Sequence, residues 1–266
     1  MSEATEHSQR PAKRGRLARI VRSRDFARDI LVTTLGVLIA LGIGEVVEEI
    51  RWKLRIASTQ TAIERELGLV HAVYLSELEL QPCMARRIGE LDELLAQARS
   101  TGRLPQIENI GFPPNFGGFG DSWDLATGTE IPLKMDSQAV LETATLWANE
   151  DIHETLVDRQ RNAFDRLLIL EDRAGPFSDG RLHEAERDLV EIKNVTASIL
   201  FIARRDSEML RQEGVRPMYG PGEPLDRKLL HRETRRRTIC QPMNVDGAPY
   251  RLKGRPWSPR VALSPA

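Results

Sequence analysis

The stretch ILVTTLGVLIALGIG, from Ile30 to Gly44, contains no charged residue and decides the fold. The helical pattern continues through Glu45 to Ile50, which makes 21 residues in all. A helix of that length rises roughly 30 Å, the thickness of the hydrocarbon core of a bilayer. Glu45 should mark the outer edge of the apolar span, and Trp52 follows where interfacial aromatic residues are common. The sequence therefore predicts a transmembrane helix from Ile30 to Ile50.

Two other interpretations of this stretch remain open. A cleaved signal peptide would have a shorter apolar region, and Ala40 to Gly42 loosely resembles a cleavage site. The pattern past Gly44 is uninterrupted helix, however, whereas a peptidase needs an extended segment. A buried helix of a soluble protein is the third interpretation. We favour a retained membrane anchor.

Basic residues are concentrated before the apolar stretch. The cluster consists of Arg10, Lys13, Arg14, Arg16, Arg19, Arg22, Arg24 and Arg28. Fewer basic residues follow the stretch, and such an asymmetry predicts that the N-terminal side is cytoplasmic. A basic arm could also bind nucleic acid, but the net charge of −1 indicates no general affinity for it. We expect residues 1–29 to be a cytoplasmic arm, and the remainder to lie in the periplasm of a bacterium, attached to its inner membrane.

Small residues recur at every fourth position of the apolar stretch. Gly36, Ala40 and Gly44 share one helical face, where two membrane helices could approach closely. The same residues are also simply frequent in membrane helices. The spacing is consistent with a homodimer seam.

The rest of the chain predicts an all-α domain, in which the transmembrane helix continues into a periplasmic helical bundle over residues 51–213. Aromatic residues are sparse, and the apolar positions recur at helical spacing. The expected helices run to about Leu80, then 84–98, 137–147, 151–173 and 179–212. Pro82 should end or kink the first of them. Residues 214–266 are expected to form a linker, a short basic helix over 225–237 and a loosely attached, proline-rich tail.

A long irregular loop separates the second and third expected helices. It contains a large share of the aromatic residues: Phe112, Phe116, Phe119 and Trp123. These side chains could line a groove for a ligand or peptide, or they could attach the loop to the helices.

The two cysteines are Cys83 and Cys240. In an oxidising compartment, a lone pair most simply forms a disulfide, which here would tie the C-terminal segment to the helical domain. Two unrelated buried thiols are the alternative.

No motif indicates catalysis, and we predict no catalytic, cofactor-binding or metal-binding residues. The histidines are isolated, without metal-ligand spacing, and are expected to face solvent. No nucleophile elbow or phosphate-binding glycine loop is present, and the carboxylates alternate with arginines as on solvated helix faces.

Several short motifs resemble a family of uncharacterised single-span membrane proteins of Gram-negative bacteria. The similar positions are 36–42 (GVLIALG), Trp52, Cys83, 102–105 (GRLP), Pro113, Pro114, Ser122, Trp123 and Cys240. The resemblance implies an inner-membrane anchor and a periplasmic helical domain, and no catalytic activity.

These observations predict an interaction or scaffold protein of the cell envelope, which binds the bilayer, an envelope protein of unknown identity, and a second copy of itself. The alternative is a periplasmic ligand-binding sensor that acts through a partner, since an arm of 29 residues is too small for an output domain. A hydrolase is the least supported class.

Overall fold

The computed structural model describes residues 15–114, 119–171, 173–220 and 223–259, with side chains from residue 26 onward. The chain divides into two compact units, residues 1–57 and 58–266. The elements of the described residues are α1 (Gly15–Thr101), β1 (Arg103–Leu104), β2 (Ile107–Glu108), α2 (Asp121–Thr127), α3 (Ile131–Lys134), α4 (Ser137–Leu167), β3 (Gly175–Pro176), α5 (Asp179–Gln212), α6 (Arg227–Arg236), β4 (Asn244–Val245) and β5 (Ala248–Pro249). The fold class is therefore all-α, as the sequence predicts, with very short strands.

The first unit contains the apolar part of α1. Among the described residues, α1 provides the one stretch apolar enough to cross a membrane, with a mean hydropathy of 2.3 over its best window. None of that window is buried within the chain. A helix that exposes apolar side chains around its whole circumference needs an apolar environment. The stretch is therefore a candidate membrane anchor.

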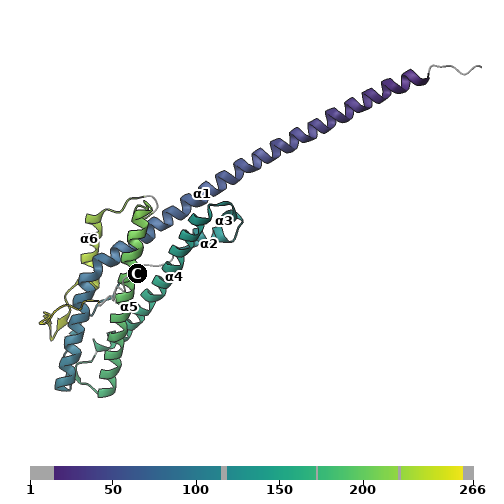
Figure 1. Cartoon of the computed structure of the whole chain (residues 1–266). Helices are drawn as coiled ribbons and strands as arrows, with labels where there is room; N and C mark the ends of the chain where they lie inside the picture. Colours follow the sequence, from purple (N-terminus) through teal and green to yellow (C-terminus); the bar gives the residue numbers. More distant parts are fainter. Residues whose placement is uncertain (1–14, 115–118, 172, 221–222, 260–266) are drawn as a thin grey trace, which may run out of the picture. The chain divides into compact units, whose positions relative to one another are not determined.

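The second unit is built on three helices, namely the later part of α1 together with α4 and α5 (Figure 1). Their buried residues form two main clusters. The larger contains Leu91, Phe164 and Ile192, one from each helix, and the smaller contains Val70, Trp147 and Ala203. Each cluster therefore joins all three helices.

Pro82 does not end the first helix, because α1 continues unbroken to Thr101. Proline removes one backbone hydrogen bond. Pro82 lies on the exposed side of the helix, while Leu80 and Met84 on either side of it are buried in the core. The burial of Leu80 and Met84 stabilises the helix at the position where Pro82 lacks a backbone hydrogen bond.

The two helices expected over 137–147 and 151–173 are a single helix, α4, which ends at Leu167 and is followed by a 3₁₀ turn at Leu168–Leu170. No glycine or proline interrupts α4. The helix begins as expected, since the Asp136 side chain accepts hydrogen bonds from the backbone N–H groups of Gln138 and Ala139.

Two small antiparallel sheets join distant parts of the chain. β1 pairs with β3, and β4 lies between β2 and β5. In the second sheet, Ile107 pairs with Val245, so the segment after α1 is hydrogen-bonded to the segment after α6. The sheets therefore attach the loop and the C-terminal segment to the bundle.

Candidate functional site

The core of the bundle follows a regular alternation of three- and four-residue steps. On α1 the buried positions at this spacing are Ile63, Leu67, Val70, Tyr74 and Glu77 and, after one step of seven residues, Met84, Ile88, Leu91, Leu95 and Ala98. On α4 they are Leu146, Glu150, His153, Val157, Gln160, Phe164 and Leu167. On α5 they are Leu182, Ala185, Leu189, Ile192, Thr196, Ile199, Ala203, Asp206 and Leu210. Each helix thus carries polar side chains at positions that normally hold apolar knobs.

Five of these residues form what we call the polar layer, defined as Tyr74, Glu77, Glu150, His153 and Asp206. The Tyr74 hydroxyl donates a hydrogen bond of 2.7 Å to Oε2 of Glu150. The His153 ring lies edge-on to the Tyr74 ring, with 5.1 Å between centroids. Its Nδ1 is 3.7 Å from the same Glu150 oxygen. The layer therefore links α1 to α4 through a tyrosine, a carboxylate and an imidazole.

His153 does not neutralise the carboxylates. Its side chain is fully buried, and neither ring nitrogen has a hydrogen-bond partner among the described residues. Burial lowers the pKa of His153 to about 4, so the ring is neutral near pH 7. The contact with Glu150 is consequently not an ion pair at neutral pH.

The carboxylates of the layer are only partly compensated. Arg205 donates from Nε to Oδ1 of Asp206 at 2.6 Å, so this carboxylate has a cationic partner. Glu77 has no hydrogen bond or ion pair within the described part of the chain. Burial and the neighbouring Glu150 raise the pKa of Glu77 to about 8. Burial also raises the pKa of Glu150 to about 7, although the Tyr74 hydrogen bond acts in the opposite direction.

This arrangement can take up and release protons in the neutral range. Two facing carboxyl groups without a cation cannot both ionise cheaply in a buried site, so one or both retain a proton. Among the described residues, no three His, Cys, Asp or Glu side chains are placed to hold a metal ion.

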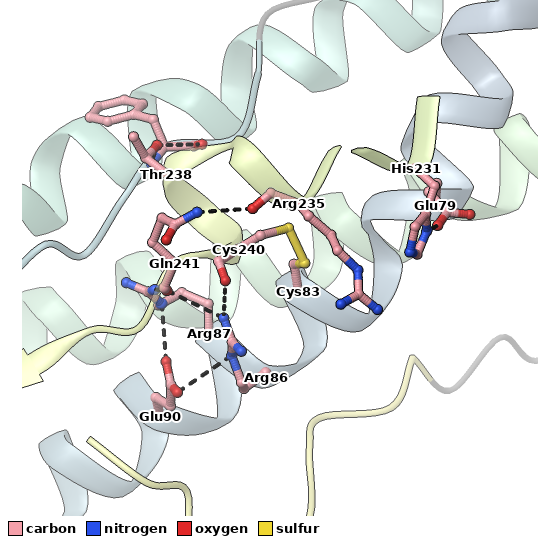
Figure 2. The surroundings of a disulfide bond; sticks show 11 residues. Glu79, Cys83, Arg86, Arg87, Glu90, His231, Arg235, Thr238, Cys240 and Gln241 are labelled. Atoms are coloured by element: carbon pink, nitrogen blue, oxygen red, sulfur yellow. Dashed lines mark hydrogen bonds and ion pairs between the residues drawn. A yellow bond between two sulfur atoms is a disulfide. The ribbon is translucent and has the colours of Figure 1, made fainter. Parts of the chain in front are cut away.

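The second notable feature is the attachment of the C-terminal segment 226–259, which we call the strap. Cys83 and Cys240 lie at disulfide distance, with 2.03 Å between their sulfur atoms, as the sequence predicts. Figure 2 shows the pair beside Arg86 and Arg87 of α1. Arg86 donates to the carbonyl oxygen of Cys240 at 2.8 Å, and Arg87 donates to that of Gln241 at 2.6 Å. The disulfide is thus flanked by charge-assisted hydrogen bonds to the strap.

Arg87 is the largest fully buried side chain of the described residues. It forms an ion pair with Glu90, with 3.0 Å between Nε and Oε2, and donates to the carbonyl oxygens of Asn109 and Ile110. Burial lowers the pKa of Arg87 to about 10, which leaves it charged at neutral pH. One guanidinium therefore joins α1, the loop after it and the strap.

The end of the strap is held by α1 and is not loose, contrary to the sequence prediction for the tail. Glu93 accepts hydrogen bonds from the Tyr250 hydroxyl at 3.0 Å and from the backbone N–H of Lys253 at 3.1 Å. Trp257 packs against the larger core cluster and donates its backbone N–H to the carbonyl of Ala85. Contacts across the fold, which composition does not reveal, order this proline-rich segment.

The aromatic residues of the loop are not gathered in one groove. Phe112 packs against the larger cluster, whereas Phe119 and Trp123 pack against the smaller one, and Phe116 lies outside the described residues. Phe119 and Trp123 border a shallow cavity of about 240 Å³ beside Trp147. This distribution suits attachment of the loop to the helices.

Two further sets of predicted residues are the small-residue face of the apolar stretch and the histidines. Gly36, Ala40 and Gly44 are exposed, and added Cβ atoms at the two glycines would meet nothing within 4 Å. His71 and His153 are buried, so the prediction that the histidines face solvent is wrong for both. A short polar side chain or imidazole can occupy a core position when its helix face is otherwise apolar.

No protein-family model matches the chain, and no curated protein or solved structure is significantly similar to it. The fold and the cysteine pair define an all-α protein with an apolar N-terminal helical stretch and a disulfide-tied helical domain.

Proposed function

We propose that the chain is a single-span inner-membrane protein whose helical domain lies in the periplasm and serves as an interaction or scaffold module. The observation that carries the proposal is the fully exposed apolar stretch of α1, preceded by a cluster of arginines. Apolar side chains exposed on every side of a helix are stable in lipid, and the excess of arginine on the N-terminal side fits the positive-inside rule.

The cysteine pair supports the periplasmic location of the domain. Disulfides form and persist in oxidising compartments such as the bacterial periplasm, and are rare in the cytosol. Cys83 and Cys240 are both in the second unit, on the C-terminal side of the apolar stretch. An N-terminal cytoplasmic arm and a periplasmic domain satisfy the charge rule and the redox requirement together.

Exposed apolar side chains support an interaction role. Leu125 on α2, Leu133 on α3 and Leu141 on α4 are 74%, 82% and 62% exposed. The three elements are consecutive, α2 contacts α3, and α3 contacts α4. We call these residues the apolar patch. Large exposed leucines grouped on neighbouring elements are typical of protein–protein contact sites.

The alternative sensor function receives less support. A ligand site would be an apolar cavity with a few convergent polar groups. A groove of about 650 Å³ lies between the start of α4 and the segment after α5, but Glu64, Glu142 and Glu213 border it together with Arg65 and Arg216. The separation of Phe112 from Phe119 and Trp123 likewise favours a scaffold over a ligand-binding sensor.

The scaffold role predicts a contact that depends on the apolar patch. Bifunctional cross-linking in intact cells should trap the protein in a discrete larger species, and Leu133→Asp should remove that species while the protein level stays unchanged. The matched control is Ile169→Asp, which changes another exposed apolar residue, outside the patch. Equal loss in both variants, or survival of the species in Leu133→Asp, would contradict the role of the patch.

A further inference from the structure

We propose that the polar layer is a proton-binding site that controls the packing of α1 against α4. A proton held by Glu77 and Glu150 keeps the layer closed, and its release separates the two helices locally and admits water. This inference concerns the helical domain alone and goes beyond the scaffold function.

The positions of Glu77 and Glu150 in their helices favour a bound proton. Glu77 and Glu150 occupy core positions between buried neighbours of the same seams, namely Tyr74 and Met84 on α1 and Leu146 and Val157 on α4. Their backbones lie in regular helices, so neither carboxylate can leave the core without a change in helix packing. An ionised carboxylate in such a position must be paired, hydrated or protonated.

The charged groups around Glu77 and Glu150 also favour a bound proton. From α4, Glu154 and Asp151 add negative potential at Glu150, and from α5 Asp206 adds more. Arg205, the one cation of α5 that acts on the layer, is held by Asp206 and lies 5.7 Å from the centre of the Phe201 ring. Within the described part of the chain, no cation therefore remains to pair with Glu77 or Glu150.

His153 lies in the same layer and is neutral near pH 7. A buried imidazole with two unpartnered nitrogens beside a carboxylate is costly, and such groups are rare in folded proteins. The ring fills the layer without compensating its charge. It also offers a nitrogen 3.7 Å from Glu150 that can accept or donate a hydrogen bond when the layer rearranges or water enters.

These surroundings determine whether the stability of the layer rises or falls with pH. The carboxyl pKa values are higher in the folded chain than in an unfolded one, where glutamate titrates at its ordinary value. The stabilisation from the protonated layer is therefore complete below that ordinary value. It is lost as the pH rises through about 7 and about 8.

The opening should be local. The larger core cluster begins at Leu80 of α1, beyond Glu77, whereas Tyr74 of the layer belongs to the smaller cluster, and Cys83 of α1 is linked to Cys240. These contacts stabilise the ends of the bundle while the layer opens, as in sub-global unfolding units.

Hydrogen exchange of the full chain in detergent micelles tests the proposal at about pH 6 and about pH 8.5, after correction for the intrinsic exchange rate. The opening constant of amides in 70–80 and 146–157 should rise about tenfold or more with pH in the wild type. In Glu77→Gln the rise should be at least about fivefold smaller than in the wild type, because Glu150 alone still titrates in the layer. Glu64→Gln, an exposed change on the same helix, should retain the wild-type response.

A pH-independent wild type, or an equal response in Glu77→Gln and the wild type, would overturn the proposal. If Glu77→Gln does not fold, carboxyl ¹³C NMR of the wild type can measure the pKa values of the glutamates directly. Two glutamates titrating near neutral pH support the site, whereas glutamates that all titrate at about pH 4 to 5 refute it.

Discussion

Removal of the disulfide should destabilise the domain through its unfolded state. The perturbation is Cys83→Ser together with Cys240→Ser. The bridge closes a loop with a sequence separation of 157 residues. The chain-entropy model gives about 5 kcal/mol at 25 °C for a loop of this length, as an upper limit, and measured losses are typically about 2–4 kcal/mol.

The folded strap should survive the loss of the bridge. Arg86 and Arg87 donate to the carbonyls of Cys240 and Gln241, and Ile239 is fully buried beside them. These contacts do not involve the sulfur atoms. We therefore expect the native structure to remain, while the free energy of unfolding falls by about 2–5 kcal/mol.

The assay is urea unfolding of the full chain in micelles, followed by tryptophan fluorescence at about pH 6, where the polar layer is protonated. The wild type with reductant should match the double variant, and reductant should not change the variant further. A loss below about 1 kcal/mol would refute the reasoning on loop closure. Rapid hydrogen exchange of the amides in 238–245 in the folded variant would refute the independent attachment of the strap.

Arg87→Met leaves buried carbonyl groups without donors and should lower the free energy of unfolding by about 3–5 kcal/mol in urea titrations, whereas the more exposed Arg86→Met should cost about 1 kcal/mol. Between about pH 5 and about pH 8 the wild-type free energy of unfolding should fall as pH rises, and Glu77→Gln should flatten that slope in the same titration. Gly36→Ile should abolish a dimer seen by cross-linking in micelles, while Gly42→Ile, off the small-residue face, should leave it intact. A pH-independent stability, equal losses for the two arginine variants, or equal effects of the two glycine variants would each contradict the corresponding argument.

Local patterns in the sequence were sufficient to predict the all-α class and much of the helical structure. The three- and four-residue spacing from Ile63 to Tyr74, and again from Met84 to Ala98, identifies the buried face of α1. Asp136 caps α4, and Gly214, with a φ of 76°, follows the end of α5. These features depend on neighbours within one helix, so a single segment carries enough information.

The polar layer was missed because acidic residues are normally assigned to the solvated face. The signal that could have revealed it is the register itself. Continuing the alternation from Tyr74 reaches Glu77, and counting back from Phe164 and Val157 reaches His153 and Glu150. Only the packing of three helices shows that these positions face one another and lack a cation.

The attachment of the strap also could not be predicted from local sequence patterns. Arg87 contacts backbone oxygens at Asn109 and Gln241, which are 22 and 154 residues away. The strands that hold the strap are two residues long and have no recognisable pattern. Such contacts arise from the tertiary fold, although the cysteine pair did predict the correct point of attachment.

The most direct test of the account is the location of the C-terminal domain. Alkaline phosphatase, which requires periplasmic oxidation for activity, can be fused after Ala266 and expressed in a Gram-negative host. A periplasmic, membrane-anchored domain should give an active reporter that remains in the membrane fraction after salt and carbonate washes. An inactive fusion whose matched cytoplasmic reporter is active, or an active fusion released into the soluble fraction, would contradict it.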